Sequence, residues 1–81
     1  MTDYKYLILA NDLKDLAHKH EERAVGCDFF LKRNREDYEQ SSLDYYTERK
    51  EEAKRTAKEL LSLSRGYAAI FMDSVEEEAG T

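Results

Sequence analysis

The chain has 81 residues, a net charge of −5, one cysteine, and neither proline nor tryptophan. A chain of this length forms one small domain with a small core, so we expect it to gain stability from oligomerisation, a metal or disulfides. A single cysteine excludes a disulfide within the chain. Because no apolar leader follows Met1 and no apolar run is long enough to cross a bilayer, the sequence predicts a cytoplasmic protein without membrane contact.

The acidic charge is concentrated near the C-terminus. Residues 73–78 carry four carboxylates, whereas fourteen acidic and thirteen basic residues nearly balance over residues 1–72. Clusters of like charge are usually solvated and disordered. The sequence therefore predicts a folded domain over residues 1–73 and a disordered acidic tail over residues 74–81.

Apolar and small residues recur every three or four positions through the first half of the chain, which predicts a long helix with one buried stripe. Thr2 and Asp3 can cap its start. Gly26 either ends this helix, giving three helices in all, or is tolerated within it at a cost of about 1 kcal/mol. The stripe keeps its phase across Gly26, which favours the continuous helix. The stripe comprises Tyr6, Leu9, Leu13, Leu16, His20, Ala24, Cys27, Phe30, Asn34 and Tyr38.

A second stripe predicts a second helix of similar length, with a turn near residues 39–42. Ser41 and Asp44 resemble a capping box, so we expect this helix to begin at Ser41 or Ser42. The stripe comprises Tyr46, Ala53, Ala57, Leu60, Ser64, Tyr67 and Phe71, with a gap at Arg49 and Lys50. Two such helices predict an all-α fold, an antiparallel two-helix hairpin.

The bulkiest apolar residues lie near the two chain ends, which meet at the same end of such a hairpin. They surround each helix on most sides, and a contact between two helices covers only one side. We therefore expect a homodimer, in which two hairpins form a four-helix bundle. The predicted dimer interface is Tyr6, Leu9, Leu13, Leu60, Leu63, Tyr67, Ile70 and Phe71.

The opposite end of the hairpin combines basic residues with tyrosines. Nucleic-acid surfaces use both residue types, but seven acidic residues share this segment, which argues against a nucleic-acid partner. Tyrosine and arginine are also enriched at protein–protein hot spots. The predicted partner-binding residues are Tyr38, Tyr45, Tyr46, Arg35 and Arg49.

No combination of residues predicts catalysis, a metal or a cofactor. His18 and His20 point in different directions on a helix, and Cys27 is two turns from His20, too far for an activated thiolate. We therefore expect a small non-enzymatic regulator or inhibitor that acts as a helical dimer and binds an unidentified protein. Two alternatives remain open: an assembly protein whose self-association is its function, and a weak nucleic-acid-binding dimer.

Overall fold

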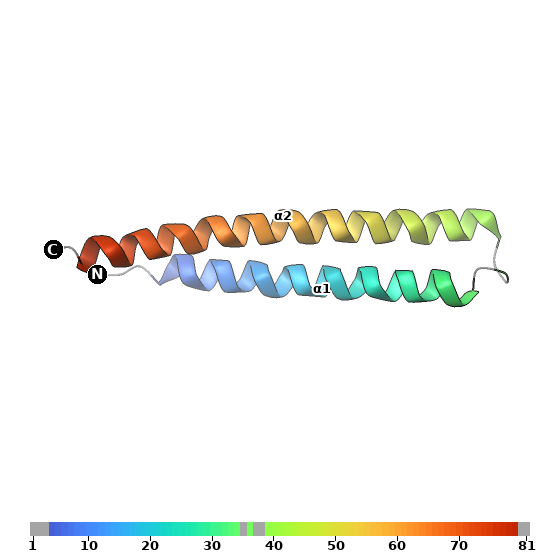
Figure 1. Cartoon of the computed structure of the whole chain (residues 1–81), viewed down its shortest axis with the longest axis horizontal. Helices are drawn as coiled ribbons and strands as arrows, with labels where there is room; N and C mark the ends of the chain where they lie inside the picture. Colours follow the sequence, from blue (N-terminus) through green and yellow to red (C-terminus); the bar gives the residue numbers. More distant parts are fainter. Residues whose placement is uncertain (1–3, 35, 37–38, 80–81) are drawn as a thin grey trace.

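The computed structural model describes residues 4–34, 36 and 39–79. These residues form two helices, α1 (Lys5–Asn34) and α2 (Gln40–Ala79), and contain no strand. The helices lie side by side and antiparallel, in a rod of 65 × 14 × 13 Å (Figure 1). The start of α1 and the end of α2 lie at one end of the rod, which we call the base, and the end of α1 and the start of α2 lie at the other end, the tip. The predicted all-α antiparallel hairpin is confirmed.

α1 passes through Gly26 without a break, so the continuous helix is confirmed and the three-helix alternative does not apply. A Cβ atom added at Gly26 would meet nothing within 4 Å, so the glycine lies on an open face of the helix. Its cost is only the usual helix penalty of about 1 kcal/mol. The helical hydrogen bonding and packing of the residues on both sides of Gly26 outweigh that penalty.

Each helix begins one residue after a backbone carbonyl that accepts its first hydrogen bond. The carbonyl of Tyr4 accepts from the amide of Ile8 at 3.0 Å, and that of Glu39 accepts from the amide of Leu43 at 3.1 Å. The predicted start at Ser41 or Ser42 is therefore wrong, because α2 already begins at Gln40. The amide of the Gln40 side chain donates to the Asp44 carboxylate at 2.9 Å, which replaces the predicted capping box. The predicted caps Thr2 and Asp3 lie outside the described residues.

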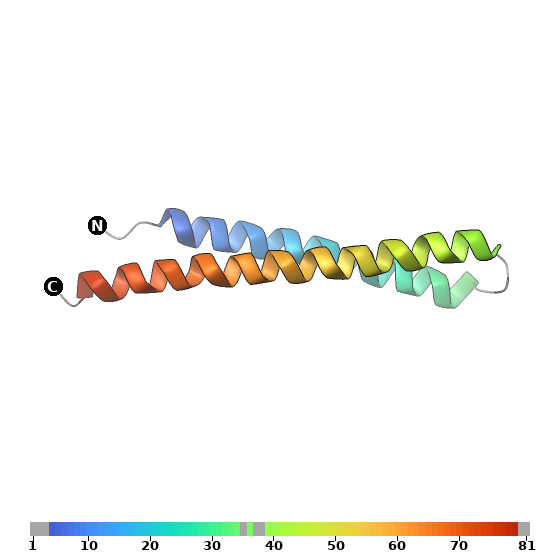
Figure 2. The ribbon, with the colours of Figure 1, turned by 90° about the horizontal axis from the view of Figure 1, so that it is seen from above.

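The two helices differ in length, contrary to the sequence-based expectation. α1 has 30 residues and α2 has 40, which correspond to about 45 and 60 Å. α2 projects beyond the start of α1 at the base (Figures 1 and 2). It includes residues 74–79, where the sequence predicted a disordered tail. No glycine or proline interrupts this segment, and glutamate is a good helix former.

The core of the hairpin consists mainly of alanine. Ala10, Ala17 and Ala24 recur every seven residues along α1 and are at most 3% exposed. They pack against α2, where Ala53 and Ala57 are equally well buried. A seven-residue repeat is typical of helices that wind around each other, and Figure 2 shows α1 crossing α2 along the rod. We call this contact between the helices the seam.

Ser64 shows how closely the helices approach. Its hydroxyl is buried and donates to the main-chain carbonyl of Ala10 on the other helix at 2.7 Å. A side chain as short as serine reaches a carbonyl of the facing helix only when the two backbones are close. Alanine in the neighbouring layers permits that approach.

The first stripe was partly wrong. The sequence placed Leu9 and Leu16 in the seam, but these side chains are 37% and 44% exposed, and the adjacent residues Ala10 and Ala17 are buried instead. A helix with a seven-residue repeat buries one set of positions throughout, and in α1 that set contains the alanines. All seven members of the second stripe are buried or half-buried, as predicted.

Aromatic pairs complete the seam at both ends. At the base, the Tyr6 and Tyr67 rings stack with their centroids 6.1 Å apart, and Tyr4 lies 5.8 Å from Phe71. Near the tip, Phe30 packs on Tyr46 at 4.2 Å. The bulky side chains therefore join the helices near their ends, and the alanines join them in between.

Candidate protein-binding surfaces

Four large aliphatic side chains lie exposed beside the seam between the base and the middle of the rod. We call them the leucine strip: Leu9, Leu16, Leu63 and Ile70. They are between 37% and 54% exposed, although each helix is otherwise packed closely on the other. Leu9 and Leu16 are seven residues apart on α1, and so are Leu63 and Ile70 on α2. This spacing keeps each pair at a constant position relative to the seam.

The predicted dimer interface therefore divides into two groups. Leu9, Leu63 and Ile70 are exposed and belong to the leucine strip. The other members are half-buried within the hairpin, where rings such as Tyr6 and Tyr67 contact each other. This second group comprises Tyr6, Leu13, Leu60, Tyr67 and Phe71. Leu16 was not among the predicted interface residues, although its seven-residue spacing from Leu9 marks it as an equivalent position.

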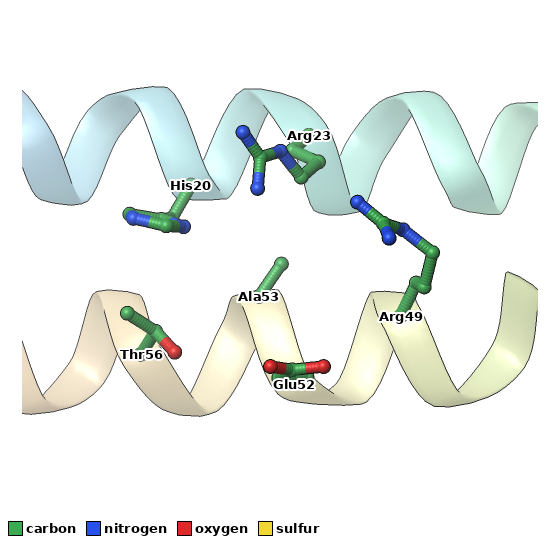
Figure 3. Close-up of a pocket in the computed structure, with 6 residues that line it drawn as sticks. All are labelled: His20, Arg23, Arg49, Glu52, Ala53 and Thr56. Carbon is green, nitrogen blue, oxygen red and sulfur yellow. The ribbon is translucent and has the colours of Figure 1, made fainter.

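A small cavity of about 90 Å³ opens on the seam midway along the rod (Figure 3). Its lining residues are His20, Arg23, Arg49, Glu52, Ala53 and Thr56. Arg23 comes from α1 and Arg49 from α2, and Figure 3 shows the Arg49 guanidinium in the space between the helices and that of Arg23 lying over α1. We call this cavity the arginine notch. Two arginines and a single glutamate give it a net positive charge.

The arginine notch lies on the same side of the seam as the leucine strip. Arg23 is seven residues from Leu16, and Thr56 is seven residues from Leu63, so both continue the series that form the strip. The strip and the notch are therefore one continuous surface. It is apolar near the base and cationic towards the middle of the rod.

The other side of the seam carries an ion-pair cluster. Lys50 occupies the gap in the second stripe, and its ammonium lies 2.6 Å from the Asp28 carboxylate of α1. Lys32 contacts the same carboxylate at 3.0 Å. The hydrogen bond from Lys50 has the largest effect on the pKa of Asp28, and together with the bond from Lys32 it lowers that pKa to about 2. The same bond to Asp28 raises the pKa of Lys50. This cluster links the helices without adding apolar surface.

Exposed aromatic side chains lie near the tip. Tyr45 is 53% exposed, and its hydroxyl accepts a hydrogen bond from Arg49 at 3.1 Å. Phe29 is 62% exposed and has the Arg33 guanidinium 5.9 Å from its ring centroid. Phe29 was missed by the sequence analysis, which counted only tyrosines near the tip.

The remaining predicted tip residues are placed differently. Tyr46 is half-buried and packs on Phe30 within the hairpin, with its ring 5.4 Å from Tyr45. Tyr38 and Arg35 lie outside the described residues. Arg49 is exposed, but it lines the arginine notch on the strip side of the seam. Among the described residues, the exposed aromatic side chains at the tip are therefore Phe29 and Tyr45.

The described residues contain no group of three or more histidine, cysteine or carboxylate side chains placed to hold a metal. His18 is exposed, His20 lines the arginine notch, and Cys27 is half-buried with a free thiol. Neither helix, over the part of the chain that the structure describes, has a stretch long and apolar enough to span a membrane.

No protein-family model matches the chain, and no curated protein or solved structure matches it either. The surfaces of the hairpin itself are therefore the basis for a functional proposal.

Proposed function

We propose that the protein is a small non-enzymatic regulator or inhibitor that forms a dimer at its base and binds another protein through its tip. One observation carries this proposal: the described core consists of five alanines, Leu31 and Ser64, while many large apolar side chains are exposed. Among the described residues, no large side chain is fully buried, whereas leucines, isoleucines and aromatic residues are exposed on both helices.

The leucine strip supports the dimer. Complete burial of a leucine or isoleucine contributes roughly 1.5–3 kcal/mol, and the strip residues are about half exposed, so covering them contributes roughly 4 kcal/mol per protomer. A domain of this length has a total stability of about 4–12 kcal/mol. Leaving the strip in water would therefore forgo a free energy comparable to the stability of the whole hairpin.

The tip supports a second, heterologous contact. Phe29 and Tyr45 are large rings held on two different helices, and each has an arginine beside it. Rigid aromatic side chains combined with arginine are the residues that dominate binding energy in protein–protein contacts. Neither ring belongs to the leucine strip, so both stay available to another protein in a dimer joined along the strip.

The first test is the molar mass in solution, measured by light scattering across a hundredfold dilution. A dimer of constant mass supports the proposal. A monomer throughout refutes the dimer, and a mass that keeps growing with concentration favours the assembly role instead.

The second test compares protein capture by the parent, by Tyr45→Ala and by a matched control, Ile8→Ala. Ile8 is 58% exposed but lies near the base. We expect a protein captured by the parent to be lost with Tyr45→Ala and retained with the control. Equal capture by both variants would refute the tip as the binding surface. Tyr46→Ala is unsuitable, because Tyr46 packs within the hairpin.

A further inference from the structure

One series on α2, in which Thr56 is half-buried and the other members are exposed, has a symmetric spacing of apolar and charged residues. At seven-residue intervals it reads Arg49, Thr56, Leu63, Ile70 and Glu77. Leu63 is the central member, and Arg49 and Glu77 lie fourteen residues away on either side. At 1.5 Å per residue, each charge is about 21 Å from Leu63 along the helix. Opposite charges are therefore equidistant from an apolar centre.

We propose that a second copy of the chain docks antiparallel on the leucine strip, with the two-fold axis at Leu63. Arg49 of each copy then pairs with Glu77 of the other. This inference rests on the proposed dimer and specifies its surface, its orientation and its register. It requires α2 to extend as a helix past residue 74, and α2 does extend to Ala79.

A two-fold axis at Leu63 brings complementary groups together along the whole strip. It places Leu63 against its own copy, Thr56 against Ile70, and Arg49 against Glu77 at both ends of the contact. Arg23 lines the same notch as Arg49 and adds positive charge opposite Glu77. A two-fold contact of this kind uses the same patch on both copies, as the commonest homodimers do.

The same charges disfavour a parallel dimer. In a parallel pairing in register, Arg49 would face Arg49 and Glu77 would face Glu77. Like charges placed opposite each other reduce affinity and suppress wrong arrangements. The charge pattern therefore selects the antiparallel arrangement, and the apolar centre supplies the contact area.

The surface area of the hairpin is consistent with a second copy. Its accessible surface is 6406 Å² for a mass of 9.5 kDa. A compact monomer of that mass exposes about 5,000 Å². The excess of roughly 1,400 Å² exceeds the 800 Å² or so that each partner buries in a stable interface of standard size. A second copy on the strip can therefore cover enough surface to give a stable dimer.

The test is crosslinking with a short bis-maleimide linker, in a Cys27→Ala background that removes the native thiol. Arg49→Cys and Glu77→Cys proteins are prepared separately, checked for helicity and mixed. We expect a covalent dimer from the mixture and none from either protein alone, because equivalent positions would be about 42 Å apart in the antiparallel dimer.

Each other outcome of the crosslinking overturns the inference. Covalent dimers from Arg49→Cys alone indicate a parallel pairing. A protein that sediments as a dimer but gives no product from the mixture uses another surface, and the proposed dimer then stands without this register. A monomer under all conditions refutes the proposed dimer as well.

Charge reversal gives an independent measurement of the same contact. We expect Arg49→Glu or Glu77→Arg to raise the dimer dissociation constant roughly tenfold, because two favourable pairs become two repulsive ones. The double variant restores both pairs and should return the dissociation constant to within about threefold of the parent value. The control is Arg55→Glu, an exposed arginine outside the strip series. A double variant no tighter than the single variants would overturn the inference.

Discussion

The replacement Ala17→Leu tests whether alanine sets the distance between the helices. Ala17 has no exposed surface, and the layers on either side of it contain the buried residues Ala10 and Ala24. A leucine at this position needs space that the seam does not have. The helices must either separate locally or force the new side chain into a strained rotamer.

The magnitude follows from the cost of overpacking. Inserting extra methylene groups into a closely packed contact costs about 1–3 kcal/mol overall. Separation of the helices also stretches the hydrogen bond from Ser64 to Ala10, which contributes about 1 kcal/mol, and loosens the alanine layers on both sides. We therefore expect the free energy of unfolding to fall by about 1–3 kcal/mol. For a domain of this size, each kcal/mol lowers the melting temperature by about 4–8 °C.

The assay is thermal unfolding followed by circular dichroism at 222 nm, at one fixed protein concentration. Ala69→Leu is the matched control, because Ala69 is exposed on α2 and leucine is nearly as good a helix former as alanine. Its free energy of unfolding should stay within about 0.5 kcal/mol of the parent value. An Ala17→Leu protein that melts at or above the parent temperature would refute the close alanine seam.

Three further predictions concern single residues. Ser64→Ala should lower the free energy of unfolding by about 1 kcal/mol in urea titrations, because the seam loses the hydrogen bond to Ala10; an unchanged midpoint would contradict this role. Gly26→Ala should raise the same free energy by about 0.5–1 kcal/mol, since an added Cβ meets open space; a lower midpoint would contradict it. Asp28→Asn should lower the melting temperature near pH 6 but not near pH 2. The pKa of Asp28 is lowered from 3.8 to about 2 by Lys50 and Lys32, so the stabilisation is present above pH 4 and is lost as the pH falls to about 2. A difference that persists near pH 2 would exclude this ion pair as its cause.

The helices and their antiparallel arrangement could be predicted from the sequence because they depend on patterns that span many residues. The chain has no proline, and the second stripe keeps a helical period from Tyr46 to Phe71. Such a stripe tolerates one interruption, and the structure places Lys50 in that gap, paired with Asp28 across the seam. The start of α2 was missed because a capping motif is local, and a competing bond from Gln40 engages Asp44.

The candidate surfaces were less predictable because they depend on which of two adjacent residues faces the seam. Leu9 and Ala10 differ by one position, and both fit a three-to-four spacing over a short stretch. Only the seven-residue repeat over three alanines distinguishes them. At the tip, Phe29 and Phe30 present the same difficulty: Phe30 packs on Tyr46, whereas Phe29 points outward.

Along the middle of the seam the buried residues are small, and Leu31 is the one large core residue among those that the structure describes. Two helices alone bury only a narrow seam. The hydrogen bond from Ser64 to a main-chain carbonyl of α1 requires the two backbones to be close together there. Small side chains fit there, so the leucines next to them in sequence are displaced to its flank. At the flank they lack cover from their own hairpin, yet they are placed where a third and a fourth helix would contact them. The close alanine seam and the exposed leucine strip are therefore two consequences of one spacing, and that is why a change at Ala17 should affect both the stability of the hairpin and its association.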